Sequence, residues 1–195
     1  MIVRALSATA LIIALFICPF ALSQFSLAAQ PYTDHEAYAV YSALLESVLT
    51  EKPGTPVIRV ETESFANCID SPNPQPDFAE ALSAYTELTT KHWLLEREFQ
   101  LSRPYEMMRQ EEIKTMFESP GDGWKRFYET FPGSPGIFQF SAVGFNADKT
   151  VAIVYMGKQC HWLCGGGTQH VLQKKDGKWQ RVATKGGGGG CSWAS

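Results

Sequence analysis

The stretch that decides the fold is Val151-Ala152-Ile153-Val154-Tyr155-Met156, six consecutive apolar residues in the last third of the chain. Valine, isoleucine and tyrosine favour strands over helices. A run this short with no polar position is typical of a strand that is buried on both faces. We therefore expect residues 151–156 to form the central strand of a sheet.

Strand patterns continue on both sides of this run. Residues 137–145 form another strand candidate, and Asn146-Ala147-Asp148 predicts the turn between the two. Further along, residues 168–175 and 178–184 flank the pair Asp176-Gly177. An Asp-Gly pair between two strands is typical of a type I′ hairpin, because both central residues need a positive φ. The sequence thus predicts a β-meander over residues 137–184, followed by a short C-terminal tail.

The preceding part of the chain, residues 33–131, has mainly helical patterns. Thr33 and Glu36 match a capping box, and apolar residues at helical spacing follow as far as Pro53-Gly54. A strand is predicted over residues 56–65. Further helices are predicted from Asp77 to about residue 88 and around residues 111–117 and 122–131.

Helices followed by strands favour an α+β fold. We expect one domain over residues 30–195, with the N-terminal helices packed on one face of a C-terminal antiparallel sheet. The length of 195 residues suits a single domain. The composition, with 45% hydrophobic residues and 19% charged residues, excludes an intrinsically disordered chain.

Residues 1–29 have the pattern of a secretory signal peptide. Arg4 precedes the apolar run 10–22, and small residues offer cleavage after Ser23 or after Ala29. The run is shorter than a membrane-spanning helix requires, so no stable membrane span is expected after the signal is removed. The sequence predicts an exported protein, either periplasmic or extracellular. A formal charge of −3 and the lack of a basic patch argue against nucleic acid as a partner.

Four cysteines follow the signal: Cys68, Cys160, Cys164 and Cys191. An even number in an exported chain favours disulfides. We favour Cys160 with Cys164 at the tight end of a hairpin, which leaves Cys68 to pair with Cys191. The alternative is a zinc site that uses Cys160, His161, Cys164 and Cys191, although the sequence has only one knuckle-like cysteine pair.

No motif for a catalytic residue or a bound cofactor stands out. The glycine runs 165–167 and 186–190 lack the Lys-Ser/Thr pair and the following helix of a phosphate-binding loop. No Gly-x-Ser-x-Gly nucleophile elbow occurs either. We expect neither a cofactor nor a catalytic set. A hydrolase acting on an extracytoplasmic polymer stays open as an alternative, and it would need a cleft with two convergent carboxylates or a histidine with an acid and a nucleophile.

Trp162 and Trp193 lie near the cysteines and the glycine runs. Together with His161 they could form an exposed surface for sugar rings or for another protein. The candidate partners are therefore an envelope protein or a polysaccharide. On sequence alone we favour a different interpretation, in which the two tryptophans cap the end of the sheet core, because large aromatic side chains are mostly buried.

The C-terminal region contains a series of short motifs: Val143-Gly144-Phe145-Asn146, Val154-Tyr155, Cys160-x-x-Leu163-Cys164-Gly165, Leu172-x-Lys174-x-Asp176-Gly177-Lys178-Trp179 and Trp193-x-Ser195. With these motifs it resembles an uncharacterised group of small exported bacterial proteins. The resemblance covers about residues 120–195, and it implies export and the Cys160–Cys164 pair but no activity. Together with the patterns above, it favours an exported binding or envelope-associated module.

Overall fold

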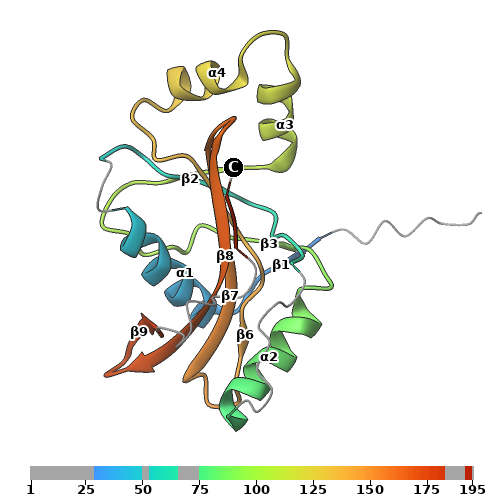
Figure 1. Ribbon diagram of the computed structural model, residues 1–195, viewed down its shortest axis with the longest axis vertical. Helices are drawn as coiled ribbons and strands as arrows, with labels where there is room; N and C mark the ends of the chain where they lie inside the picture. Colours follow the sequence, from blue (N-terminus) through green and yellow to red (C-terminus); the bar gives the residue numbers. More distant parts are fainter. Residues whose placement is uncertain (1–28, 50–52, 66–74, 183–191, 195) are drawn as a thin grey trace, which may run out of the picture.

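The computed structural model describes residues 29–49, 53–65, 75–182 and 192–194 (Figure 1). The predicted signal peptide lies outside these residues except for Ala29, and so do Cys68 and Cys191. Within the described residues, no helix combines the length and the apolar character needed to cross a membrane.

Helices and a large mixed sheet make up the described part of the chain, so the predicted α+β class is confirmed. The sheet has the strand order β10-β8-β7-β5-β2-β4, while β6 pairs with β7 and β9 with β8. Its strands are β2 (Val57–Arg59), β4 (Glu106–Met108), β5 (Ile137–Phe140), β6 (Gly144–Phe145), β7 (Val151–His161), β8 (Cys164–Lys175), β9 (Lys178–Arg181) and β10 (Ser192–Ala194). The short strands β1 (Gln30–Pro31) and β3 (Trp93–Leu94) pair separately.

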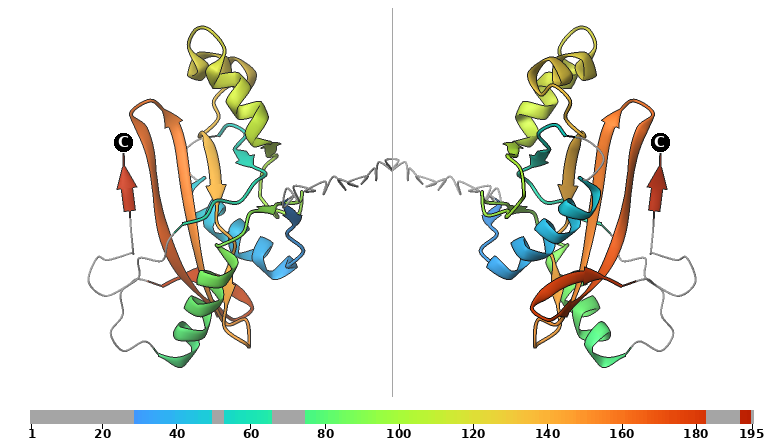
Figure 2. Two further views of the ribbon diagram at one scale, coloured as in Figure 1. Left: turned by 90° about the vertical axis from the view of Figure 1, so that its right-hand side faces the viewer. Right: turned by 90° about the vertical axis from the view of Figure 1, so that its left-hand side faces the viewer.

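The predicted central strand is β7, which lies between β8 and β5. It extends beyond Met156 to His161, and it pairs with β8 along almost its whole length. The resulting β7–β8 hairpin is the longest feature of the molecule and curves along its length (Figure 2). At its other end β8 continues into β9 through Asp176 and Gly177, with φ angles of 49° and 73°, as the predicted type I′ turn requires.

The sheet carries helices on both faces, so the expectation of helices on one face is wrong. Helix α1 (His35–Val48) packs against Ala152, Val154 and Leu172, whereas α2 (Pro76–Leu88) packs against Ile153 and Val171. Neighbouring residues of a strand point to opposite faces, so α1 and α2 lie on opposite sides. The apolar run 151–156 provides both packing surfaces, which explains why it contains no polar position.

The sheet is also mixed rather than antiparallel. β2, which lies in the part of the chain predicted as mainly helical, pairs in parallel with both β4 and β5. Beyond β2, helices α3 (Gln110–Glu118) and α4 (Gly123–Thr130) cover Val57 and Ile137 on the same face as α2. They sit at the end of the sheet where the β7–β8 hairpin turns, while α2 and β9 lie at the opposite end (Figure 1).

Helix α1 begins one residue later than the capping-box pattern predicts. The N-cap is Asp34, whose carboxylate accepts a hydrogen bond from the Glu36 backbone N–H. The Glu36 side chain instead accepts hydrogen bonds from Lys174 Nζ at 2.7 Å and Trp179 Nε1 at 2.6 Å. The lysine, and then the indole, lower the pKa of Glu36. This carboxylate therefore ties α1 to the β8–β9 hairpin rather than capping its own helix.

Candidate functional site

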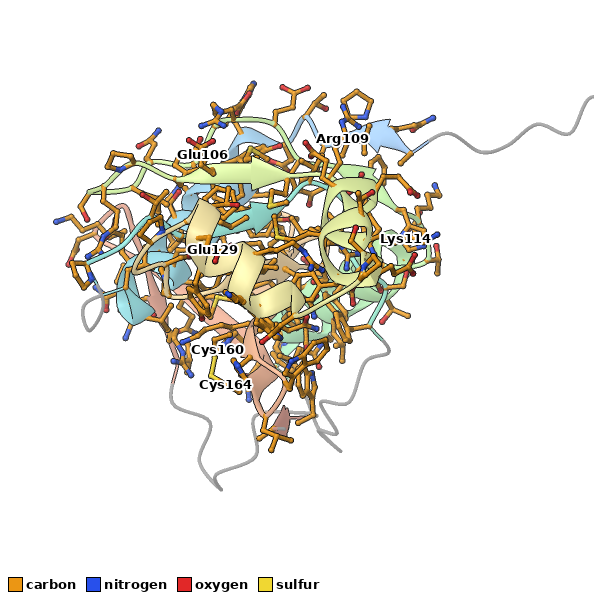
Figure 3. All side chains as sticks on the ribbon, turned by 90° about the horizontal axis from the view of Figure 1, so that it is seen from above. Glu106, Arg109, Lys114, Glu129, Cys160 and Cys164 are labelled. Atoms are coloured by element: carbon orange, nitrogen blue, oxygen red, sulfur yellow. A yellow bond between two sulfur atoms is a disulfide. The ribbon has the colours of Figure 1, made fainter. Side chains whose placement is uncertain are left out.

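The end of the β7–β8 hairpin is held by a covalent link. Cys160 and Cys164 form a disulfide, which is the pair that the sequence analysis favours, and only Trp162 and Leu163 lie between the two strands (Figure 3). The tip is also attached to α4, since the Tyr128 hydroxyl donates a hydrogen bond of 2.6 Å to the carbonyl oxygen of Cys160. The disulfide and this hydrogen bond thus restrict the backbone that carries the two residues of the turn.

The described part of the chain has three exposed large apolar side chains, and all lie on or beside this tip. Leu163 is 85% exposed, Trp162 58% and Trp193 37%. The sequence-based preference for tryptophans that cap the core is therefore wrong for Trp162 and Trp193. A two-residue turn has no layer above it to bury its side chains, and β10 lies at the edge of the sheet. Clustered exposed apolar side chains are typical of binding surfaces.

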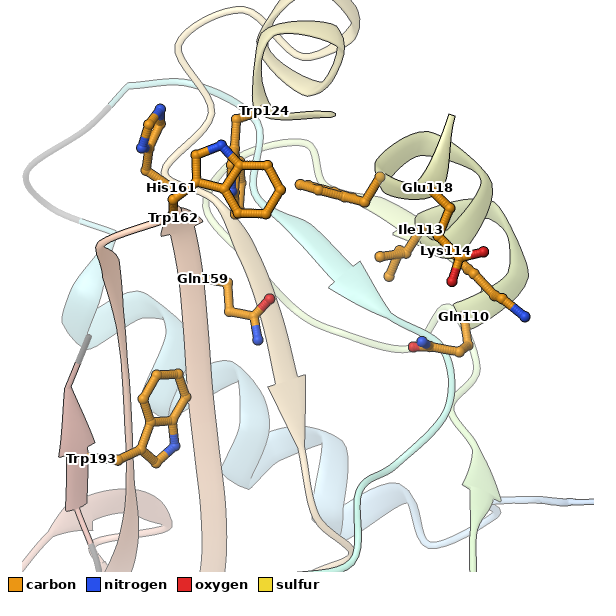
Figure 4. A pocket seen from close by; sticks show the side chains of 10 residues that line it. Gln110, Ile113, Lys114, Glu118, Trp124, Gln159, His161, Trp162 and Trp193 are labelled. Carbon is orange, nitrogen blue, oxygen red and sulfur yellow. The ribbon is translucent and has the colours of Figure 1, made fainter. Parts of the chain in front are cut away.

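Between the tip and α3 lies a pocket of about 470 Å³ (Figure 4). This volume is within the usual range for small-molecule sites. The sequence-predicted residues His161, Trp162 and Trp193 all contribute to its wall. The other lining residues come from α3, α4 and β7: Gln110, Ile113, Lys114, Phe117, Glu118, Trp124 and Gln159.

Aromatic rings contact one another along one side of the pocket. Phe117 of α3 meets the Trp162 ring edge-on at a centroid distance of 6.1 Å and the buried Trp124 ring edge-on at 4.8 Å. The His161 ring stacks on Trp124 at 6.2 Å. Edge-to-face and offset contacts of this kind are favourable and directional. They fix the orientation of the exposed Trp162 ring against a buried aromatic base.

The polar groups of the pocket combine neutral amides with charges of both signs. Gln159 of β7 and Gln110 of α3 carry amides, and their side chains extend into the space below Trp162 (Figure 4). Lys114 and Glu118 add one charge of each sign on α3. An amide both donates and accepts hydrogen bonds, so it can match a hydroxyl group, which does the same. The lining therefore combines apolar ring faces with hydroxyl-compatible groups and no net charge.

A hydrogen bond to a residue on β7 holds the side chain of Trp193 in the pocket lining. Its indole Nε1–H donates a hydrogen bond of 2.5 Å to the hydroxyl of Tyr155 on β7. Burial raises the pKa of Tyr155, although hydrogen bonds from Trp193 and Gln139 act in the opposite direction. Tyr155 is therefore a neutral phenol at physiological pH.

Comparisons with known proteins provide no further guide: no family model, no curated protein and no solved structure matches this chain.

The arrangement offers little for the two alternative chemistries. The sulfurs of Cys160 and Cys164 are bonded to each other, and a disulfide sulfur is not the thiolate that zinc binds. No group of three His, Cys, Asp or Glu side chains within the described residues could hold a metal ion. For a hydrolase, the described lining contains a single carboxylate, Glu118, rather than a convergent pair.

Sequence reasoning found the residues of the hairpin tip but missed those of α3. Gln110, Lys114 and Phe117 lie more than 40 residues before the tip, and nothing in the local pattern places this helix beside it. The sequence predicts a helix that ends near Phe117 but no functional role for this side chain. The only local signal is the helical spacing of Ile113 and Phe117, which predicts an apolar stripe but not its partner.

We expect Cys164→Ser to lower the free energy of unfolding by about 2 kcal/mol under oxidising conditions, because a disulfide that closes so short a loop restricts the unfolded chain only modestly. Urea denaturation with and without a reductant measures this. Cys164 is exposed, so serine there leaves the packing intact, and the loss should vanish when both proteins are reduced. The buried Cys160 is the companion position, since Cys160→Ser also tests packing. A loss of equal size in both conditions would assign the effect to packing instead.

Proposed function

We propose that this protein is an exported, disulfide-stabilised binding module that holds a polysaccharide of the cell envelope in the pocket between the β7–β8 hairpin tip and α3. The observation that carries the proposal is the exposure of Trp162 and Trp193 around one pocket, on strands whose tip is fixed by a disulfide. Export is supported by the signal-like pattern of residues 1–29 and by the disulfide, which suits an oxidising compartment.

The chemistry of the lining favours a sugar ring as the bound group. One face of a pyranose ring presents C–H bonds that pack against an indole ring, whereas its rim presents hydroxyl groups. Trp162 and Trp193 offer indole rings, and the amides of Gln159 and Gln110 offer paired donors and acceptors. An uncharged glycan strand needs no net charge in its site, and the charged residues of the lining are one lysine and one glutamate.

A polysaccharide fits the observations better than a docked protein. Protein partners of ordinary affinity cover about 800 Å² of each surface and place their central side chains in a desolvated core. Here the most exposed apolar residue, Leu163, does not line the pocket. The rings that do line it surround a concave space, which suits insertion of a narrow chain.

We expect Trp162→Ala to weaken binding to purified peptidoglycan sacculi and to a soluble tetramer of N-acetylglucosamine by about tenfold or more, since aromatic anchors dominate the energy of such sites. Co-sedimentation with sacculi and calorimetry with the tetramer measure this. The melting temperature should be almost unchanged, because Trp162 is 58% exposed.

The matched control is Leu163→Ala, the neighbouring residue of the same turn. A sugar ring in the pocket predicts that this variant binds like the unmodified protein. If the tip instead binds through a general apolar surface, as for a partner protein, both variants should lose affinity for the sacculi together, because Leu163 is the more exposed side chain. Equal losses, or an unmodified protein that binds neither probe, would contradict the proposal.

A further inference from the structure

We propose that Tyr155 is a positioning residue of the pocket, and that its hydroxyl fixes the indole of Trp193 in the orientation that a ligand meets. Its effect on affinity rests on the proposed function. The orientation of the indole, however, can be measured in the absence of any ligand, so the two claims are separable.

Trp193 reaches the pocket from the edge of the sheet. It lies in the middle of β10, which the structure describes over three residues and which pairs with the outer edge of β8, with Trp193 opposite Gly167. So short an edge strand fixes the backbone but leaves a half-exposed side chain several rotamers. One contact restricts that freedom, the 2.5 Å hydrogen bond from the indole N–H to Tyr155 Oη.

The sheet is built so that the hydroxyl can make this contact. Tyr155 is on β7, and β8 lies between it and β10. A Cβ atom at Gly167 would lie 1.8 Å from Tyr155 Oη and 2.9 Å from Trp193 Nε1. Only glycine therefore leaves room for the phenol and the indole to meet above β8. The glycine run 165–167 therefore includes the position at which the two side chains meet.

The ring of Tyr155 is itself held in place. Phe65 stacks on it with ring centroids 3.4 Å apart, and a Cβ atom at Gly157 would collide with the Gln139 amide beside it. The Gln139 amide and the Tyr155 ring thus pack against the same glycine. Because packing holds the ring, loss of the hydroxyl alone should leave the fold intact and free the indole. An indole that already has the orientation of the bound state loses less conformational entropy when a ligand binds.

The experiment compares Tyr155→Phe with the unmodified protein by NMR of the indole N–H groups, with Trp193→Phe used to assign the Trp193 signal. We expect the Trp193 N–H to exchange with solvent about five- to tenfold faster in Tyr155→Phe, as the loss of one hydrogen bond implies. The N–H signals of the other tryptophans should not change. Affinity for the N-acetylglucosamine tetramer should fall about threefold to tenfold, with little change in melting temperature.

The matched control is Tyr128→Phe, which removes a hydroxyl that bonds the Cys160 carbonyl rather than Trp193. Its Trp193 N–H should exchange at the original rate. Unchanged exchange in Tyr155→Phe, or equal acceleration in Tyr128→Phe, would overturn the positioning role whatever the ligand results are. Faster exchange together with unaltered affinity would overturn the coupling to binding. A tetramer that fails to bind the unmodified protein would instead reject the proposed function and leave the exchange result valid.

Discussion

Gly136→Ala is expected to reduce the free energy of unfolding by about 4 kcal/mol. Losses of this size are exceptional, and here the new side chain would displace a neighbouring strand. Gly136 directly precedes β5 and has a φ of +127°, a conformation that L-amino acids rarely adopt. A Cβ atom there would lie 2.2 Å from the carbonyl oxygen of Gln159 and 3.2 Å from Cys160 Cβ. The alanine must therefore push β5 away from β7 just below the hairpin tip. Urea denaturation at neutral pH measures the loss.

Gly177→Ala separates the two causes of this loss. Gly177 also has a positive φ, +73°, but nothing lies within 4 Å of a Cβ atom built on it. Its variant should lose only the conformational cost of a positive φ, about 1 kcal/mol. A similar loss at both positions would show that the collision at Gly136 relaxes cheaply. A clearly larger loss at Gly136 would show that the contact between β5 and β7 is rigid where the pocket begins.

The features that sequence predicted well are local. The β8–β9 turn follows from Asp176-Gly177, because two neighbouring residues are enough to set a type I′ geometry. Helices α3 and α4 lie close to the two helical stretches predicted around residues 111–117 and 122–131, and the central position of β7 follows from an apolar run with no polar residue. Each of these signals lies within a dozen residues of the feature that it predicts.

The features that sequence missed depend on contacts between distant segments. β2 is inserted in parallel between β4 and β5, whose residues lie more than 40 positions away along the chain. No local pattern encodes which strand becomes its neighbour. The same reason accounts for the unpredicted half of the pocket, since α3 approaches the hairpin tip only through tertiary packing. The exposure of Trp162 differs from the prediction for another reason: tryptophan is buried on average, but a residue in a two-residue turn has no neighbouring layer to cover it.

We expect the unmodified protein to lose about 2 kcal/mol of stability between pH 7.5 and pH 5 through His170. This side chain is buried on β8, and its Nε2 atom finds no hydrogen-bond partner among the described residues. Burial, and then the charge of Arg181, lower the pKa of His170 to about 4. In the unfolded chain its pKa is near 6.5. Below that pH this histidine is protonated in the unfolded state, whereas in the folded state it stays neutral. The stability is complete above pH 6.5 and is lost progressively as the pH falls toward 4.

His170→Leu should abolish most of this acid sensitivity, as urea denaturation at the two pH values would reveal. It should also keep or improve stability at pH 7.5, because it removes a buried polar atom without a partner among the described residues. His35 is the matched control, since it is exposed and the Glu98 carboxylate raises its pKa. A raised pKa stabilises the folded state at low pH, so His35→Asn should leave the protein more sensitive to acid rather than less. If His170→Leu kept the full loss between pH 7.5 and pH 5, burial of this histidine could not be its cause.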